Sequence, residues 1–220
     1  MPTPDAVIVF ADLADALRDL DEARGSPSRV RRAFSRFVDL TQRLTAAIRK
    51  DYSRLGRGEW RAKDFGGWNQ VTEFFKWLRN QDQHETPIRI SVHERRFYEV
   101  PALPGRQIPI EGTWSLEDQL QDNHEFGVMK MYPADPTTGK PSADPVEATR
   151  IEYQYLVQPH SESALRRLRE IGTTDMHQLS AACFVVLQDY FRFFLSQVGV
   201  QASESDALAE RPNGDPGSAT

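Results

Sequence analysis

Three residues near the end of a predicted helix carry side chains suited to phosphodiester chemistry. In the segment FFKWLRNQDQHE, Arg79 is followed directly by Asn80 and, five positions further on, by His84. A guanidinium binds a phosphate through two hydrogen bonds and offsets charge in a transition state. An imidazole titrates near neutral pH and can move a proton to or from a ribose hydroxyl. Because the Asn80 amide can orient a phosphate or a water, the cluster predicts RNA cleavage without a metal ion.

The same residues also have a purely structural interpretation. Arg79 can pair with Asp82, and His84 can interact favourably with the carbonyl groups at the C-terminal end of the helix. In a regular helix Arg79 and His84 are separated by about one and a half turns of rotation, so a frayed last turn is needed to bring them together. The sequence leaves both interpretations open.

Other kinds of active site have little support in the sequence. The five histidines and the single cysteine do not occur at metal-ligand spacings, so we expect no metal and no cofactor. Phosphate-binding loops of the forms GxxxxGK[ST] and GxGxxG are absent, as is the serine-hydrolase pattern GxSxG. Cys183 lies in an apolar helical segment and is expected in the core. The aromatic residues of the helical segments could stack on bases but are expected to be packing residues: Trp60, Trp68, Phe74, Phe75 and Trp77.

The cluster at Arg79, Asn80 and His84 resembles the motif of the HEPN family (higher eukaryotes and prokaryotes nucleotide-binding domains), which is Arg-x(4–6)-His with a polar residue commonly after the arginine. The resemblance implies a helical bundle that forms a homodimer, with two copies of the motif in one composite site. It also implies a metal-independent endoribonuclease, many members being toxins or phage-defence effectors. Arg79 would then contact the scissile phosphate, Asn80 would support it, and His84 would act as acid or base. An antitoxin or another defence-system protein is the partner that this resemblance implies.

The distribution of charge favours a polyanionic partner in one region. The net charge is −5, yet residues 26–63 contain eleven Arg and Lys residues against three acids. Such a local excess attracts RNA through salt-dependent phosphate contacts. The residues expected to contact RNA are Arg29, Arg32, Arg36, Arg43 and Lys50. The alternative is a solvated helix face paired with acids such as Asp15, Asp19, Asp21 and Glu22.

Helical periodicity defines the elements that position this cluster. Apolar residues recur at helical spacing over residues 5–23 and again after Ser26-Pro27, which predicts an antiparallel helical hairpin. A third helix is predicted from about Trp68 to Gln83. Further helices are predicted after Ser161, ending at Gly172, and over residues 175–198, with Thr173 or Thr174 as the N-cap. Because the last helix is apolar on most sides, it is expected to be central in the bundle or buried in a dimer.

Between Pro87 and Gln158 apolar residues recur at every second position instead of at helical spacing. This pattern predicts a small antiparallel sheet inserted into the helical bundle and hence an α+β fold. Strands are expected at residues 87–101, 126–133 and 148–159. A short helix capped by Thr113 or Ser115 is expected between the first two. We predict one domain over residues 1–201, with the insertion at about 87–158.

Residues 202–220 are acidic, lack aromatic residues and are predicted to be disordered. The N-terminus has no basic region typical of a signal peptide, and the apolar runs are shorter than a membrane span, so we expect a cytoplasmic protein with no membrane partner. Two functions remain open: a HEPN-like ribonuclease, or a non-catalytic helical dimerisation protein that uses the sheet to recognise a partner.

Overall fold

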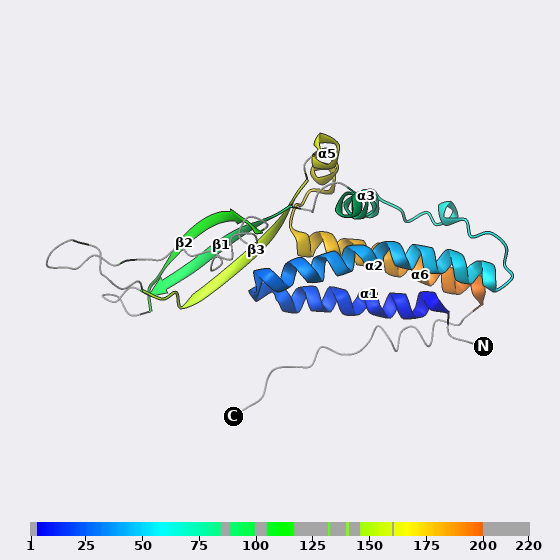
Figure 1. Ribbon diagram of the computed structural model, residues 1–220, viewed down its shortest axis with the longest axis horizontal. Coiled ribbons are helices and arrows are strands. Elements are labelled where there is room, and N and C mark those ends of the chain that lie inside the picture. Colours follow the sequence, from blue (N-terminus) through cyan, green and yellow to red (C-terminus); the bar gives the residue numbers. More distant parts are fainter. Residues whose placement is uncertain are drawn as a thin grey trace, which may run out of the picture.

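A computed structural model of the protein describes residues 4–84, 89–99, 105–116, 132, 140, 146–159 and 161–199. These residues form five helices and a three-stranded antiparallel sheet, so the expected α+β class is confirmed (Figure 1). The helices are α1 (Asp5–Glu22), α2 (Pro27–Arg54), α3 (Gln70–His84), α5 (Glu162–Ile171) and α6 (Met176–Val198). Two short 3₁₀ turns are η1 (Ala23–Gly25) and η2 (Ala62–Asp64). The strands are β1 (Arg89–Glu99), β2 (Gln107–Ser115) and β3 (Arg150–Gln158).

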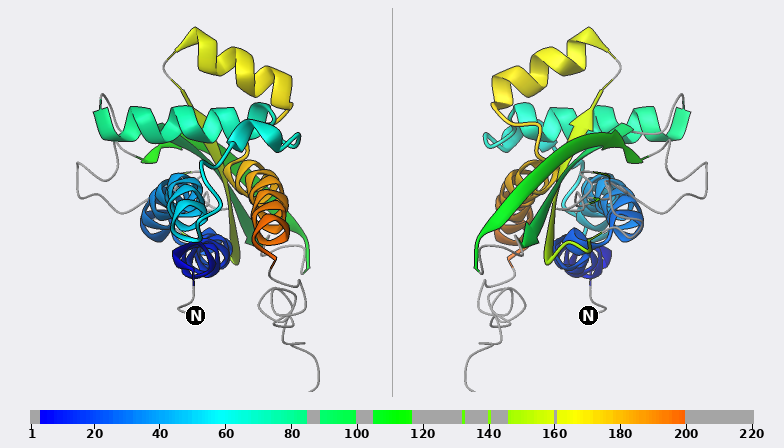
Figure 2. Two further views of the ribbon diagram at one scale, coloured as in Figure 1. Left: turned by 90° about the vertical axis from the view of Figure 1, so that its right-hand side faces the viewer. Right: turned by 90° about the vertical axis from the view of Figure 1, so that its left-hand side faces the viewer.

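Helices α1, α2 and α6 lie side by side along the length of the bundle (Figures 1 and 2). Each has a stripe of buried apolar residues at helical spacing, and burial of the three stripes against one another stabilises the bundle. The expected antiparallel hairpin of α1 and α2 is present, joined by η1. The Phe10 ring of α1 stacks on Phe191 of α6 with centroids 4.4 Å apart, which joins the two ends of the chain in one core.

Helix α3 crosses this bundle, and α5 covers the outer side of α3 (Figure 2). Phe74 and Phe75 are fully buried, and Phe75 meets Phe37 of α2 edge-on at 5.6 Å. These aromatic residues therefore anchor α3 on the bundle, as expected from their spacing. The C-terminal end of α3 extends past the side of α2 in Figure 2, so Asn80 is exposed there.

The sheet has the order β2-β1-β3 and extends away from one end of the bundle (Figure 1). Val92 is opposite Trp114 of β2 and Tyr155 of β3, so these three side chains share the face that reaches the core. At the base of the sheet the Tyr155 hydroxyl donates to the Arg24 carbonyl at 2.9 Å. The Val157 amide donates to the Thr174 carbonyl at 2.9 Å, which ties β3 to the segment that precedes α6.

Three details differ from the sequence-based expectations. Strand β2 was not expected, and Thr113, an expected helix cap, lies inside it opposite His93. The N-cap of α6 is Asp175, whose carboxylate accepts a hydrogen bond from the Gln178 amide, rather than Thr173 or Thr174. Thr173 instead accepts the Asp175 amide and so supports the cap. The strand expected at 126–133 lies outside the described residues apart from Tyr132, and the predicted disordered tail at 202–220 lies wholly outside them.

Among the described residues, α6 is long and apolar enough to span a bilayer. Length and composition alone are weak evidence, because a core helix of a soluble protein has the same properties. In this structure α6 supplies ten buried residues to the bundle and contains Asp189 and Arg192 on its exposed side. The apolar surface of α6 is therefore used mainly within one chain.

Candidate functional site at the end of helix α3

The residues of the Arg79 cluster lie on the last two turns of α3. Leu78 is fully buried and fixes the side of the helix that faces the core. Arg79, the next residue, is half-buried, and Asn80 is exposed. The cluster therefore begins at the boundary between the core and solvent, at the end of the helix that extends beyond α2.

Helix α3 continues to His84 without a break, which determines where the two key positions lie. At about 100° per residue, positions 79 and 84 are about 140° apart around the helix axis and about 7.5 Å apart along it. Position 84 instead follows Asn80, Lys76 and Glu73 along one side of α3. The helix thus places positions 79 and 80 next to each other and position 84 on a different side of its axis from position 79.

The Arg79 side chain has an unusual environment. Its Nε is buried, and it forms no hydrogen bond with any residue that the structure describes. A buried N–H group without an acceptor is costly, and the cost is larger when the group is charged. Arg79 is therefore a cation whose hydrogen-bonding capacity is not used by the described part of the protein.

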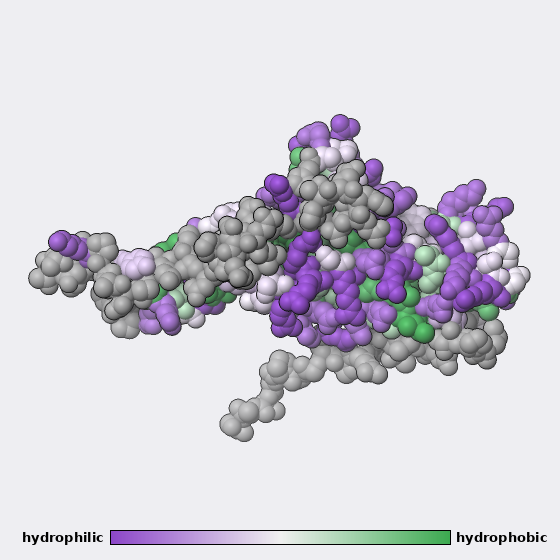
Figure 3. Space-filling model, viewed as in Figure 1, coloured by the Kyte–Doolittle hydropathy of each residue, from purple (hydrophilic) through white to green (hydrophobic). Residues whose placement is uncertain are grey.

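The five basic residues expected to contact RNA lie on α2, and three of them form ion pairs. Arg36 pairs with Asp19 at 2.6 Å, and Lys50 pairs with Asp5 at 3.2 Å, so α1 supplies carboxylates to this face. The third pair lies within α2, between Arg43 and Asp39 at 3.8 Å. Arg29 and Arg32 are exposed and have no ion pair with a described residue. Figure 3 shows a largely hydrophilic surface over α1 and α2, interrupted by a small hydrophobic area.

Two other titratable side chains are buried in the core. Burial raises the pKa of the Cys183 thiol, which stays protonated and has no role as a nucleophile. Burial lowers the pKa of His177, whose two ring nitrogens lack hydrogen bonds to any described residue. The described ranges contain no cluster of three or more His, Cys, Asp or Glu side chains that could hold a metal ion.

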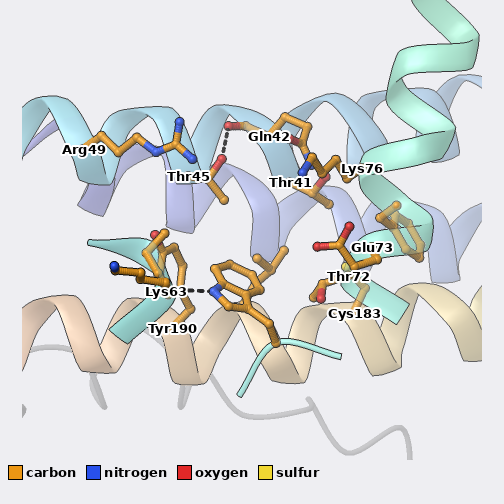
Figure 4. Close-up of a pocket in the computed structure, with 14 residues that line it drawn as sticks. Thr41, Gln42, Thr45, Arg49, Lys63, Thr72, Glu73, Lys76, Cys183 and Tyr190 are labelled. Carbon is orange, nitrogen blue, oxygen red and sulfur yellow. Dashed lines mark hydrogen bonds between the residues drawn. The ribbon is translucent and has the colours of Figure 1, made fainter. Parts of the chain in front are cut away.

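The sequence interpretation missed a cavity of about 280 Å³ between α2, α3, α6 and the segment around η2 (Figure 4). Three cations from three elements line it: Arg49, Lys63 and Lys76. The signal in the sequence was present on α2, where Thr41, Thr45 and Arg49 recur every four residues on a side opposite the arginine-rich face.

Comparison with known proteins finds no family model, no curated protein and no solved structure that matches this chain. The class of the protein is therefore argued from its own residues.

Proposed function

We propose that this protein is a HEPN-like, metal-independent endoribonuclease that acts as a homodimer through the C-terminal end of α3. The observation that carries the proposal is the guanidinium of Arg79, whose buried Nε has no acceptor among the described residues. A phosphodiester supplies anionic oxygens in the geometry that a guanidinium prefers. The exposed amide of Asn80, directly beside it, can donate to the same phosphate.

Helix geometry supports a site composed of two chains. Positions 79 and 84 are about 140° apart on one helix, so a single copy of α3 directs them differently. Two copies of α3 packed against each other can place Arg79 of one chain beside His84 of the other. The C-terminal end of α3 extends past the side of α2, away from the core of its own bundle (Figure 2).

The proposed reaction uses the substrate's own 2′-hydroxyl as the nucleophile. One imidazole accepts the proton of the 2′-hydroxyl as its oxygen bonds to phosphorus, and the second imidazole donates a proton to the leaving 5′-oxygen. The products are a 2′,3′-cyclic phosphate and a 5′-hydroxyl. Arg79 offsets the negative charge that develops on the phosphate oxygens.

An RNA-cleavage assay with matched variants tests this proposal. Arg79→Ala and His84→Ala are each expected to lower the cleavage rate by at least about a hundredfold, as loss of a general acid–base or charge-stabilising group does. The control is His93→Ala, since His93 lies on the polar face of the sheet beside Thr113. EDTA should leave the rate unchanged, and RNA with a 2′-deoxy group at the cleavage site should resist. Inhibition by EDTA, or equal cleavage of DNA, would contradict the mechanism.

A second candidate function is partner recognition by the sheet without catalysis, and one observation favours it. Beyond its base, the face that contains Val92 continues into Ile108 and Ile151, which are 45% and 40% exposed. Exposed apolar residues on one sheet face are typical of a binding surface. If the wild-type protein does not cleave RNA while Ile108→Lys abolishes capture of a cellular protein, the recognition function replaces the nuclease.

A further inference from the structure

The cavity beside α3 combines an apolar wall with a cationic rim. Leu187 and Cys183 of α6 and Phe75 of α3 form part of its wall. The Trp68 ring lies against Tyr190 at 4.4 Å between centroids, and its indole N–H donates to the Ala62 carbonyl at 2.8 Å. Because that hydrogen bond holds the ring in place, Trp68 presents a fixed aromatic surface at the cavity.

Three cations surround this wall, and each comes from a different element. Arg49 belongs to α2, Lys63 to η2 and Lys76 to α3 (Figure 4). All three are exposed, and none forms a hydrogen bond or ion pair with a described residue. The cavity lining contains a single carboxylate, that of Glu73. Because the side chains of Arg49, Lys63 and Lys76 are long and exposed, they can turn toward an anion held in the cavity.

Three other cations of α2 differ from Arg49 in their partners. Arg36, Arg43 and Lys50 lie on the other side of the helix, and each has a carboxylate partner. Arg49, which faces the cavity, has none among the described residues. A charge-balanced helix face explains the first group, whereas Arg49 has no such partner, as is also true of Arg29 and Arg32, but unlike those two residues it lines the cavity.

The threonine hydroxyl groups around the cavity already donate to backbone carbonyls, so an anion in the cavity would be held mainly by the cations. The hydroxyls of Thr41, Thr45 and Thr72 each donate to the backbone carbonyl three residues earlier in the chain, at 2.7 to 2.8 Å. Tyr190 accepts a hydrogen bond from the Trp60 indole at 2.6 Å, which leaves its own proton available as a donor. The donors available for a ligand are thus the two ammonium groups, the guanidinium, one phenol and the side-chain amide of Gln42.

We propose that this cavity binds a small aromatic phosphate monoester, with the phosphate among Arg49, Lys63 and Lys76 and the ring against Trp68. Three cations and one carboxylate leave two positive charges, and a phosphate monoester carries about −1.5 to −2 at pH 7. The volume of about 280 Å³ lies at the lower end of the range for small-molecule sites, so the ligand is small.

Calorimetric titration of the full chain with phenyl phosphate tests the proposal. We expect saturable 1:1 binding and an increase in the thermal midpoint, because the ligand binds only the folded state. Lys63→Gln, Lys76→Gln and Arg49→Gln should each weaken binding by about tenfold or more, as loss of a charged hydrogen bond does. The matched control is Arg57→Gln, an exposed cation in the same connection as Lys63 that does not line the cavity.

A cavity-filling variant separates binding inside the cavity from attraction to surface charge. Thr45→Tyr keeps every cation but occupies the space, so it should abolish binding of phenyl phosphate, while RNA cleavage, which depends on Arg79 and His84, should be unchanged. Inorganic phosphate and benzoate should bind more weakly than phenyl phosphate, and benzyl alcohol should not bind.

Several outcomes would overturn the proposal. One is the absence of phenyl phosphate binding to the wild-type chain, and another is binding that survives Thr45→Tyr in a folded protein. Equal weakening by Arg57→Gln would indicate general surface charge. Equal affinity for inorganic phosphate would show that the apolar wall takes no part. If Thr45→Tyr does not fold, the substitutions of the three exposed cations still test the proposal.

Discussion

The buried carboxylate of Asp51 holds the beginning of α1. It is 4% exposed, and its Oδ2 accepts a hydrogen bond from the Ala6 amide at 2.7 Å. Ala6 lies in the first turn of α1, where amide groups have no partner within the helix. A single side chain of α2 therefore satisfies a donor at the end of α1, where the helix dipole also favours negative charge.

We expect Asp51→Ala to lower the free energy of unfolding by about 1–3 kcal/mol, the cost of leaving a buried donor without an acceptor. Urea denaturation monitored by circular dichroism measures this change. Asp189→Ala is the control, since the exposed pair of Asp189 and Arg192 should contribute at most about 1 kcal/mol. Equal effects of the two substitutions would show that the Ala6 contact is unimportant.

His177 gives the core a dependence on pH. Its ring is 6% exposed and lies edge-on to Tyr155, with centroids 5.9 Å apart. Burial, and to a lesser extent the charge of Arg24, lowers its pKa, while Asp175 and Asp21 oppose that shift. Asp21 lies 3.3 Å from Nδ1 but without the geometry of a hydrogen bond. The folded state therefore prefers the neutral ring.

The sign of the pH effect follows from the lowered pKa. As the pH falls below about 6.5, His177 takes up a proton in the unfolded chain but resists doing so in the folded one. The unfolded state then binds more protons, so stability should decrease between pH 6.5 and the lower pKa of the folded state. His177→Phe should flatten this part of the profile of unfolding free energy against pH. An unchanged slope would assign the acid sensitivity to other groups.

Helix α2 has two basic sets that differ in their partners. Arg36 and Arg43 are paired with carboxylates, whereas Arg29 and Arg32 have no ion pair with a described residue. An arginine whose charge is already offset contributes less to the attraction of phosphates. The net positive charge counted along the sequence therefore overstates the positive charge that RNA meets.

We expect the double substitution Arg29→Gln and Arg32→Gln to weaken RNA binding more than Arg36→Gln and Arg43→Gln, which is the matched control. Fluorescence anisotropy with labelled single-stranded RNA at several salt concentrations measures the difference. Loss of two phosphate contacts should also reduce the slope of log affinity against log salt concentration by about 1.4. A larger effect from the paired arginines would contradict this assignment.

The helices could be predicted from the sequence because their apolar periodicity is strong. The start of α2 and both boundaries of α6 agree with expectation to within one residue, because the sequence has clear signals there, such as Pro27 at the start of α2. Strand β2 was missed although Ile108, Ile110 and Trp114 alternate, because Pro109 and Gly112 interrupt its β-forming residues. Pro109 is tolerated because β2 lies at the edge of the sheet.

The candidate site could be predicted only in part. Sequence alone placed Arg79, Asn80 and His84 at the end of one helix, but the burial of the Arg79 Nε depends on packing between α3 and the bundle. The cavity was missed for the same reason, since Arg49, Lys63 and Lys76 come together only after three elements pack. The pairing of Arg36 with Asp19 likewise depends on the register of the helical hairpin.

At the scale of the whole molecule, the proposed homodimer needs a contact surface. Most of α6 is buried, yet Val185 is 56% exposed on its outer side, next to Ala181 and Ala182. On α1, Ile8 is 55% exposed. Exposed apolar residues flanked by small ones permit close approach of a second helix. These residues define a candidate contact surface on the outer side of α6, separate from the end of α3, which lies on the other side of the bundle (Figure 2).

Light scattering coupled to size-exclusion chromatography at micromolar concentration should give a mass of twice 25.1 kDa. Val185→Glu should shift this mass toward the monomer, because it places a charge in the proposed contact. Gln197→Glu, which adds the same charge at an exposed position of α6 about 120° from Val185 around the helix, is the control. A monomeric wild-type chain would contradict the dimer and the two-chain site together.

The insertion of the sheet between α3 and α6 has a consequence for the order of folding. Helices α1 and α2 are consecutive, so their hairpin forms from local contacts with little loss of loop entropy. The contacts of α6 and β3 are remote, since the Trp60–Tyr190 hydrogen bond of α6 spans 130 positions and the Tyr155–Arg24 bond of β3 spans 131. The bundle therefore cannot close before the chain has returned through the sheet. In refolding experiments, far-ultraviolet circular dichroism should recover before tryptophan fluorescence, and amides of α2 should gain protection from hydrogen exchange before those of α6.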